Sequence, residues 1–306
     1  MQQMRKNSML ARPHVAVITN VGAAHLQGFH DVVNVAEQKA LIFCAMAPGD
    51  TAVINADMDH RSTFVEAARA RDLKIILYGK SADADVRMVH YENDKVEARI
   101  GDRSWSFQLS TKGEHFAINA LATLGVLTAL NLDPSHAMHA LQSFTPSSGR
   151  GDELQLPFKD GQLTVRNDAY NANPLSMAAG LAAMEQIEVA ANAKVVVLGD
   201  MLELGPHASV LHQELHLHLK NLKADRLLLC GPLMKALWDV AQADGLPGVR
   251  TAAWVGTVDE AKALLNQWLQ TGDYLMVKGS HGTQLHTVVA WLKQRHSPSA
   301  RLLETM

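Results

Sequence analysis

The first third of the chain alternates short β-branched apolar runs with longer amphipathic stretches. The apolar runs that have the length and composition of buried strands lie at 14–19, 51–55 and 74–78. Helical periodicity fills the two gaps between them, from about 31 to 46 and from about 59 to 71. Because strands and helices alternate, the pattern predicts a parallel sheet with helices packed against it.

The alternation changes after this region. Between 86 and 109, segments of period two flank Asn93-Asp94 and Gly101-Asp102, which predicts a small antiparallel meander. Two helices are predicted next, over 116–130 and 134–143. Residues 1–12 are polar and without pattern, so no regular element is predicted there.

A turn-rich segment from Pro146 to Asp152 separates this part from the rest of the chain. The βα alternation restarts after it, so we place a domain boundary near Gly149, between 1–148 and 149–306. The strands predicted for the second domain are 163–168, 194–198, 225–229, 250–254 and 273–277. The helices predicted for it are 174–187, 207–221, 232–243, 258–270 and 283–295. This pattern indicates a doubly wound α/β sheet, in which ligands bind beyond the carboxyl ends of the strands.

Composition narrows the classes of function. The hydrophobic fraction of 47% is typical of a soluble globular protein with ample material for more than one core. The net charge of −3 and the lack of a basic stripe argue against nucleic-acid binding. The sequence shows no signal peptide and no membrane span, which predicts a cytoplasmic protein. Cys44 and Cys230 lie in apolar surroundings and are predicted to be buried free thiols.

Unusual polar residues follow four of the predicted strands, at 20–25, 168–174, 199–205 and 278–281. A carboxylate at a strand end, such as Asp168, can accept hydrogen bonds from ribose hydroxyls, and the amides of Asn171 and Asn173 can bind a polar substrate. An equally ordinary role for Asp168 or Asn173 is to cap the next helix. From these residues alone the two alternatives stay open.

Other polar residues have plain structural interpretations. The carboxylates of 199–205 are consistent with solvated side chains in a glycine-rich turn. His212 and His216 have the spacing of zinc ligands, but Glu214 does not directly follow the first histidine as the hydrolase motif requires. We therefore predict an amphipathic helix with exposed or partly buried histidines. Taken alone, His25 is expected to be structural and Lys39 to be exposed to solvent.

Two common nucleotide-binding motifs are missing from these 306 residues. The sequence contains neither G-x-x-x-x-G-K-[ST] nor G-x-G-x-x-G. The chain therefore has no phosphate-binding P-loop of its own, and an unrelated Rossmann-type dehydrogenase is disfavoured.

The segments from Asp168 to Met177 and from Gly199 to Gly205 resemble the Mur ligases of peptidoglycan synthesis, and the resemblance extends from about Arg12 to the end of the chain. It implies the later part of a central ATPase domain at 1–148, with a parallel sheet and a small meander. A Rossmann-like C-terminal domain would follow at 149–306. The N-terminal domain and the P-loop of the family would lie outside this chain, so a missing N-terminal portion is an expected partner.

The resemblance also implies an activity. The expected enzyme is a cytoplasmic ATP-dependent carboxylate–amine ligase that uses ATP and Mg²⁺. Its expected substrates are a UDP-N-acetylmuramoyl-tripeptide and D-alanyl-D-alanine, which it joins through an acyl phosphate. Because the P-loop is missing, we expect the chain to be inactive on its own. The alternative is a non-catalytic binding or regulatory protein built from a ligase remnant.

The roles of individual residues are carried over by motif. His25 matches a catalytic Mg²⁺ ligand, and Lys39 matches a catalytic lysine that is carbamylated and then also binds the metal. The residues that match nucleotide-binding positions are Asn119, Arg150 and Asp168. The residues assigned to the substrate end of the cleft are Tyr170, Asn171, Asn173, Lys278 and Ser280. The sequence departs from the family at His281, where an arginine is common.

Overall fold

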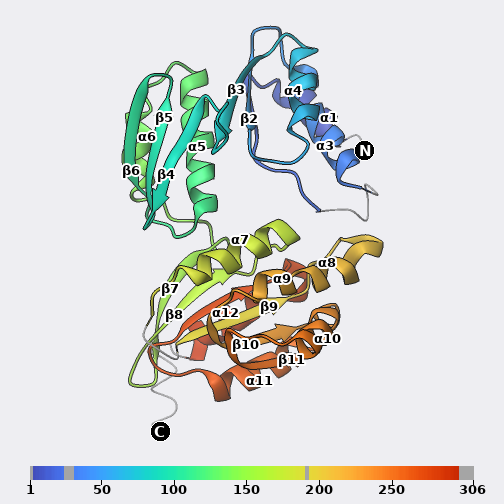
Figure 1. The fold of residues 1–306 in the computed structure, drawn as a ribbon, viewed down its shortest axis with the longest axis vertical. Coiled ribbons are helices and arrows are strands. Elements are labelled where there is room, and N and C mark those ends of the chain that lie inside the picture. Colours follow the sequence, from blue (N-terminus) through green and yellow to red (C-terminus); the bar gives the residue numbers. More distant parts are fainter. Residues whose placement is uncertain (1–2, 24–30, 190–192, 296–306) are drawn as a thin grey trace. The chain divides into compact units, whose positions relative to one another are not determined.

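The computed structural model describes residues 3–23, 31–189 and 193–295. The chain forms two compact units, 1–145 and 146–306, which divide at the start of the turn-rich segment. Each unit is described by itself below, and Figure 1 shows the elements of both. In the described part of the chain, no helix is both long enough and apolar enough to cross a membrane.

The first unit is built on one six-stranded sheet with the strands in sequence order. Its strands are β1 (Val15–Ile18), β2 (Thr51–Asn55), β3 (Lys74–Gly79), β4 (Val86–Glu92), β5 (Lys95–Ile100) and β6 (Arg103–Gln108). Strands β1 to β4 are parallel, while β5 and β6 are antiparallel additions. The predicted meander is therefore present, and it extends the parallel sheet through β4.

The helices described in this unit are α1 (Gln3–Ala11), α3 (Val32–Ala40), α4 (Arg61–Arg69), α5 (Glu114–Ala129) and α6 (Ser135–Leu141), with the 3₁₀ helix η1 (Leu41–Ala45) after α3. Helix α5 packs on strands β1 to β4. Gly125 permits this close approach, because a Cβ atom there would lie 2.8 Å from Cγ1 of Val53.

Helix α1 corrects one expectation, because residues 1–12 were predicted to have no regular element. The helix is fixed by contacts with η1. The buried hydroxyl of Ser8 donates a hydrogen bond of 2.5 Å to the carbonyl of Ile42. The apolar residues Met9 and Leu10 are exposed, and the buried residue is the polar Ser8. An apolar periodicity could therefore not have predicted this helix.

The second unit is built on a second six-stranded sheet, in the order β11-β10-β9-β12-β8-β7. Its strands are β7 (Asp152–Phe158), β8 (Gly161–Asp168), β9 (Lys194–Gly199), β10 (Ala224–Cys230), β11 (Val249–Val255) and β12 (Tyr274–Lys278). All neighbours are parallel except β7 and β8, which form a hairpin at one edge. Strand β7 was not predicted, because it carries Pro157 and charged residues, as an edge strand can.

The helices of this unit are α7 (Pro174–Glu185), α8 (Ala208–Glu214), α9 (His216–Leu219), α10 (Met234–Asp244), α11 (Val258–Trp268) and α12 (His286–Arg295). Short 3₁₀ helices precede two of them, η2 (Gly205–His207) and η3 (His281–Thr283). The helix predicted over 207–221 is thus divided into η2, α8 and α9. The predicted α/β class with mainly parallel sheets is confirmed.

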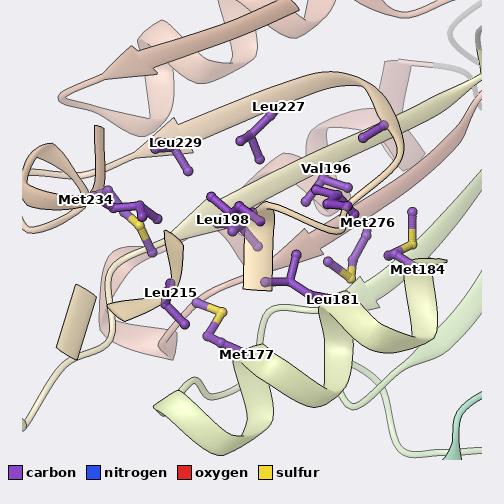
Figure 2. Close-up of a cluster of buried hydrophobic side chains, with 14 of the residues drawn as sticks. Met177, Leu181, Met184, Val196, Leu198, Leu215, Leu227, Leu229, Met234 and Met276 are labelled. Atoms are coloured by element: carbon purple, nitrogen blue, oxygen red, sulfur yellow. The ribbon is translucent and has the colours of Figure 1, made fainter. Parts of the chain in front are cut away.

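A continuous apolar cluster fixes α7 to the second sheet. In Figure 2, Met177 and Leu181 of α7 lie toward Leu198 of β9 and Met276 of β12. All four side chains are fully buried. The cluster therefore holds the start of α7 firmly over the carboxyl ends of the central strands. Outside this cluster, Cys230 is buried as predicted, whereas Cys44 is only half-buried, and both thiols are free.

Candidate functional site

Three of the predicted polar segments meet at one edge of the second sheet. Strand β12 lies between β8 and β9, and its last residue, Lys278, is in register with Asp168 and Leu198. The loops that follow these three strands therefore leave the sheet at the same edge. The sequence-based expectation that these strand ends gather is met by 168–174, 199–205 and 278–281.

The central feature of this edge is an ion pair. Nζ of Lys278 lies 2.7 Å from Oδ2 of Asp168. The lysine side chain is 2% exposed, and the aspartate side chain is 19% exposed. Gly180 of α7 makes room for the pair, because a Cβ atom there would lie 3.1 Å from Cδ of Lys278. Lys278 is thus directed at Asp168, and it is the carboxylate that reaches solvent.

Ser280 connects the three loops. Its hydroxyl donates to the carbonyl of Ala172 over 3.3 Å and accepts from the amide of Leu202 over 3.0 Å. Its own amide donates to the carbonyl of Asp200 over 3.1 Å. Ser280 is 4% exposed, so these bonds are shielded from water. The predicted substrate residue therefore has a structural position at the centre of the edge.

The two asparagines of the first loop have different surroundings. Asn173 caps α7, because its Oδ1 accepts from the amide of Ser176 over 2.9 Å while Ser176 Oγ accepts from the amide of Asn173. Pro174 occupies the first turn of the helix, as expected. Asn171 is exposed, and its Oδ1 accepts from the amide of Ala172. Of the two roles left open by the sequence, helix capping is the one observed for Asn173. Asn171 faces solvent.

Planar side chains surround the first loop. The guanidinium of Arg150 lies 4.2 Å from the ring centre of Tyr170. The ring of His281 meets Tyr170 edge-on at 5.9 Å and stacks on His286 at 4.5 Å. Gly149, with a φ of +83°, allows the contact, because its carbonyl accepts from the amide of Tyr170 and a Cβ atom would lie 2.9 Å from Cβ of Tyr170. His286 was missed, since nothing in its spacing marks it.

The loop after β9 is more buried than expected. Asp200 is 4% exposed, and its Oδ1 accepts from the amide of Met234 at the start of α10 over 2.8 Å. Burial raises the pKa of Asp200, against the opposing effect of the backbone amides of Met234 and Leu233. The prediction of solvated carboxylates in this loop is wrong for Asp200. The prediction of exposed or partly buried histidines is also wrong, because His212 and His216 are fully buried.

The carboxyl edge of the first sheet is organised around the end of β1. Nζ of Lys39 donates to the carbonyl of Asn20 over 3.0 Å, and burial lowers the pKa of Lys39. Nδ2 of Asn55 donates to the carbonyl of Thr19 over 2.8 Å, and the hydroxyl of Tyr78 donates to Ile18 over 3.1 Å. Sequence reasoning missed Asn55 and Tyr78. The only signal was a polar residue at the end of a fully buried strand.

Two predicted residues of the first unit remain. Asn119 is exposed on α5, where its backbone carbonyl accepts from the hydroxyl of Thr123. His25 lies outside the described residues, so the structure places neither its ring nor its predicted role.

Comparison with known families decides the classification. Residues 1–127 match the model of the Mur ligase middle domain, and 155–281 match the model described as Mur ligase, glutamate ligase domain. The chain belongs to the Mur ligase family. Together the two models cover most of the chain, and each falls within one of the two compact units.

Two curated relatives with the same name match most of this chain. The UDP-N-acetylmuramoyl-tripeptide–D-alanyl-D-alanine ligase of Rickettsia prowazekii is 26% identical over 92% of this chain and 61% of the relative. The ligase of the same name from Bacillus subtilis is 28% identical over 92% of this chain and 60% of the relative. The chain thus spans about three-fifths of the length of the curated relatives it matches.

Solved Mur ligase structures share the fold. MurF from Acinetobacter baumannii superposes with a TM-score of 0.80 at 25% identity, over 95% of this chain and 62% of that one. MurF from Thermotoga maritima, solved in complex with ADP, superposes with a TM-score of 0.76 at 22% identity. This superposition covers 96% of this chain and 64% of the Thermotoga maritima chain.

Proposed function

We propose that this chain supplies the middle and C-terminal parts of an ATP-dependent carboxylate–amine ligase. Its proposed reaction joins D-alanyl-D-alanine to a UDP-N-acetylmuramoyl-tripeptide. Residues 1–148 would belong to the ATP-binding domain and 149–306 to the C-terminal domain. The observation that carries the proposal is the Asp168–Lys278 pair at the gathered strand ends of a Mur ligase fold, in a chain whose relatives bear that ligase's name.

The strand ends of the second unit suit a nucleotide. One oxygen of Asp168 is held by Lys278, which leaves the other to accept ribose hydroxyls. The guanidinium of Arg150 is exposed above Tyr170, where it can pair with a phosphate in a bidentate manner. Asn119 of the first unit is proposed to contact the adenine. The ADP complex of the Thermotoga maritima MurF supports a ligand of this class.

The remaining predicted residues then take two kinds of role. Lys278 and Ser280 are almost fully buried, so we propose that they act on substrates by holding Asp168 and the loops in place. Tyr170 and Asn171 are exposed and can contact a substrate directly. Such an arrangement lowers a reaction barrier by fixing the reacting groups relative to each other, which is the main requirement of phosphoryl and acyl transfer.

The metal site of the proposal lies at the end of β1. Because burial lowers the pKa of Lys39, more of its amine is neutral, and the neutral amine is the form that reacts with carbon dioxide to give a carbamate. A carbamate carries oxygen ligands of the kind that Mg²⁺ prefers. We propose carbamylated Lys39 and His25 as two ligands. The bound ion would neutralise charge on the transferred phosphate.

The proposal is tested with a hybrid enzyme. The N-terminal part of the Bacillus subtilis relative, up to the residue that aligns with Met1, is joined to this chain. We expect mass spectrometry to detect UDP-N-acetylmuramoyl-pentapeptide only when ATP, Mg²⁺ and D-alanyl-D-alanine are all present. Substitution of Lys39→Ala in the hybrid is expected to slow this reaction by about 100-fold or more, because it removes a proposed metal ligand.

The control is the intact Bacillus subtilis relative, assayed in parallel. If the hybrid is folded by circular dichroism and binds the UDP-sugar substrate, yet gives no pentapeptide while the relative does, the ligase proposal is wrong. The non-catalytic alternative would then be preferred.

A further inference from the structure

The side chain of His212 has a defined tautomer. Its ring is 0% exposed, and Nδ1 lies 2.6 Å from the carbonyl of Ala208, one turn earlier. A carbonyl can only accept, so Nδ1 carries the hydrogen. Nε2 then has a free lone pair, and it accepts from the amide of Met201 over 2.9 Å. Both ring nitrogens are satisfied only in the neutral form, because a protonated ring could not accept from Met201.

This contact belongs to a path of hydrogen bonds that are linked through the backbone of Met201 and Leu202. The amide of Met201 donates to His212. The amide of the next residue, Leu202, donates to Oγ of Ser280. The same hydroxyl donates to the carbonyl of Ala172, in the loop that begins after Asp168. His212 therefore anchors one end of a path that runs through all three strand-end loops.

Among the described residues, the charged groups named here do not give a protonated ring of His212 a partner. Asp200, on the loop after β9, attracts a proton toward the ring, but its carboxylate is directed at the start of α10. On α10, the charges of Lys235 and Asp239 are paired with each other. Oδ2 of Asp244, at the end of α10, lies 3.4 Å from Nε2 of His216, at the start of α9, and is thus directed at the other histidine.

We propose that His212 is a positioning residue, whose neutral ring holds the strand-end loops of the second unit in place and whose protonation releases them. An effect of His212 on nucleotide binding rests on the proposed function, because it requires this edge to be the nucleotide site. The positioning of the loops by His212 does not depend on the proposed function. The sequence analysis interpreted His212 and His216 as histidines of an amphipathic helix, whereas the geometry gives His212 a role in shaping the edge.

The direction of the pH effect follows from burial. Burial is the largest effect on His212 and lowers its pKa below the ordinary histidine value, so the ring is neutral near pH 7. At a pH above the ordinary pKa of histidine, the hydrogen bond between His212 and Met201 contributes its full stability. At a lower pH, the state in which this bond is broken binds a proton more readily than the state in which it is formed. The hydrogen bond is therefore progressively lost as the pH falls.

The test uses nuclear magnetic resonance of the ¹⁵N-labelled 306-residue chain without nucleotide. At neutral pH we expect the ring of His212 to carry its proton on Nδ1. As the pH is lowered from 7, the amides of Met201, Leu202 and Ser280 should shift together, with the midpoint at which His212 titrates. In His212→Gln, whose carbonyl oxygen can still accept from Met201 but cannot be protonated, this shared transition should disappear.

The matched control is His216→Gln, which alters an equally buried histidine outside the path and should leave the transition intact. A ring proton on Nε2 of His212 in the unaltered protein would overturn the proposal, even if no variant folds. So would strand-end amides that stay constant while His212 titrates, or a transition that persists in His212→Gln. None of these outcomes bears on whether the chain belongs to a ligase.

Discussion

Replacing Asp168 with Ala is expected to lower the free energy of unfolding of the second unit by about 3–5 kcal/mol. The substitution leaves the ammonium of Lys278, which is 2% exposed, without its carboxylate. A buried charge without a partner is far more costly than an exposed one, since neither water nor a counter-charge solvates it. Urea denaturation followed by circular dichroism measures the loss, read as a lower midpoint for the second unit.

The double variant makes this prediction specific to the pair. Asp168→Asn combined with Lys278→Met removes both charges, and the methionine still fills the space beside Gly180. We expect the double variant to be more stable than Asp168→Ala alone, because no buried charge is left. As a control, Glu114→Ala breaks the exposed pair with Lys80 and should cost less than about 1 kcal/mol. A double variant that loses at least as much as Asp168→Ala would contradict the account of the pair.

Gly231→Ala is expected to cost about 2–4 kcal/mol, from backbone strain and the loss of a helix cap. Gly231 has a φ of +119°, which side chains other than glycine rarely adopt. An added Cβ atom would lie 2.5 Å from Oδ1 of Asp200. The carboxylate would have to leave the amide of Met234 that it binds at the start of α10.

Gly272→Ala separates the two causes. Gly272 also has a positive φ, +85°, but an added Cβ atom there would meet nothing within 4 Å. We expect this variant to lose only about 1–2 kcal/mol, the strain alone. The comparison is made by thermal unfolding of the two variants side by side. Equal losses in both would show that the Asp200 cap contributes nothing measurable.

Much of the fold could be predicted because the strands are short, β-branched and separated by helical periodicity. The strand from Lys194 to Gly199 is buried along its whole length, and its run of valines predicts this burial. The missed elements lack this local signal. Helix α1 is held by the buried hydroxyl of Ser8, and β7 is an edge strand that contains Pro157. Both depend on contacts between distant segments, which periodicity does not report.

The candidate site could be predicted as a place more readily than as a set of contacts. Motifs at strand ends indicated Asp168, Lys278 and Ser280, and parallel register brings them together. Nothing in the sequence showed that Lys278 and Ser280 are buried. That depends on Gly180 and on the packing of α7, which become visible only when the helix lies on the sheet.

His212 was misjudged in another respect, its burial. Its spacing from His216 was interpreted as that of exposed or partly buried histidines on an amphipathic helix, whereas the structure buries both side chains. No group of three or more His, Cys, Asp or Glu residues suited to a metal ion occurs within the described ranges. The ring is instead used by two backbone groups, the carbonyl of Ala208 and the amide of Met201. The spacing of the histidines therefore did not show that His212 is buried and bonded to the backbone on both sides of its ring.

The central claim is that the strand ends around Asp168 and Arg150 form a nucleotide site, and one measurement on this chain tests it directly. The ¹⁵N-labelled protein is titrated with ADP and Mg²⁺ to millimolar concentration, because without a P-loop in these residues we expect weak binding. The amides of 147–150 and 168–171 should shift with saturation, and Asp168→Asn should weaken the response. If ADP leaves these amides unchanged, or shifts only amides far from the strand ends, the account is contradicted.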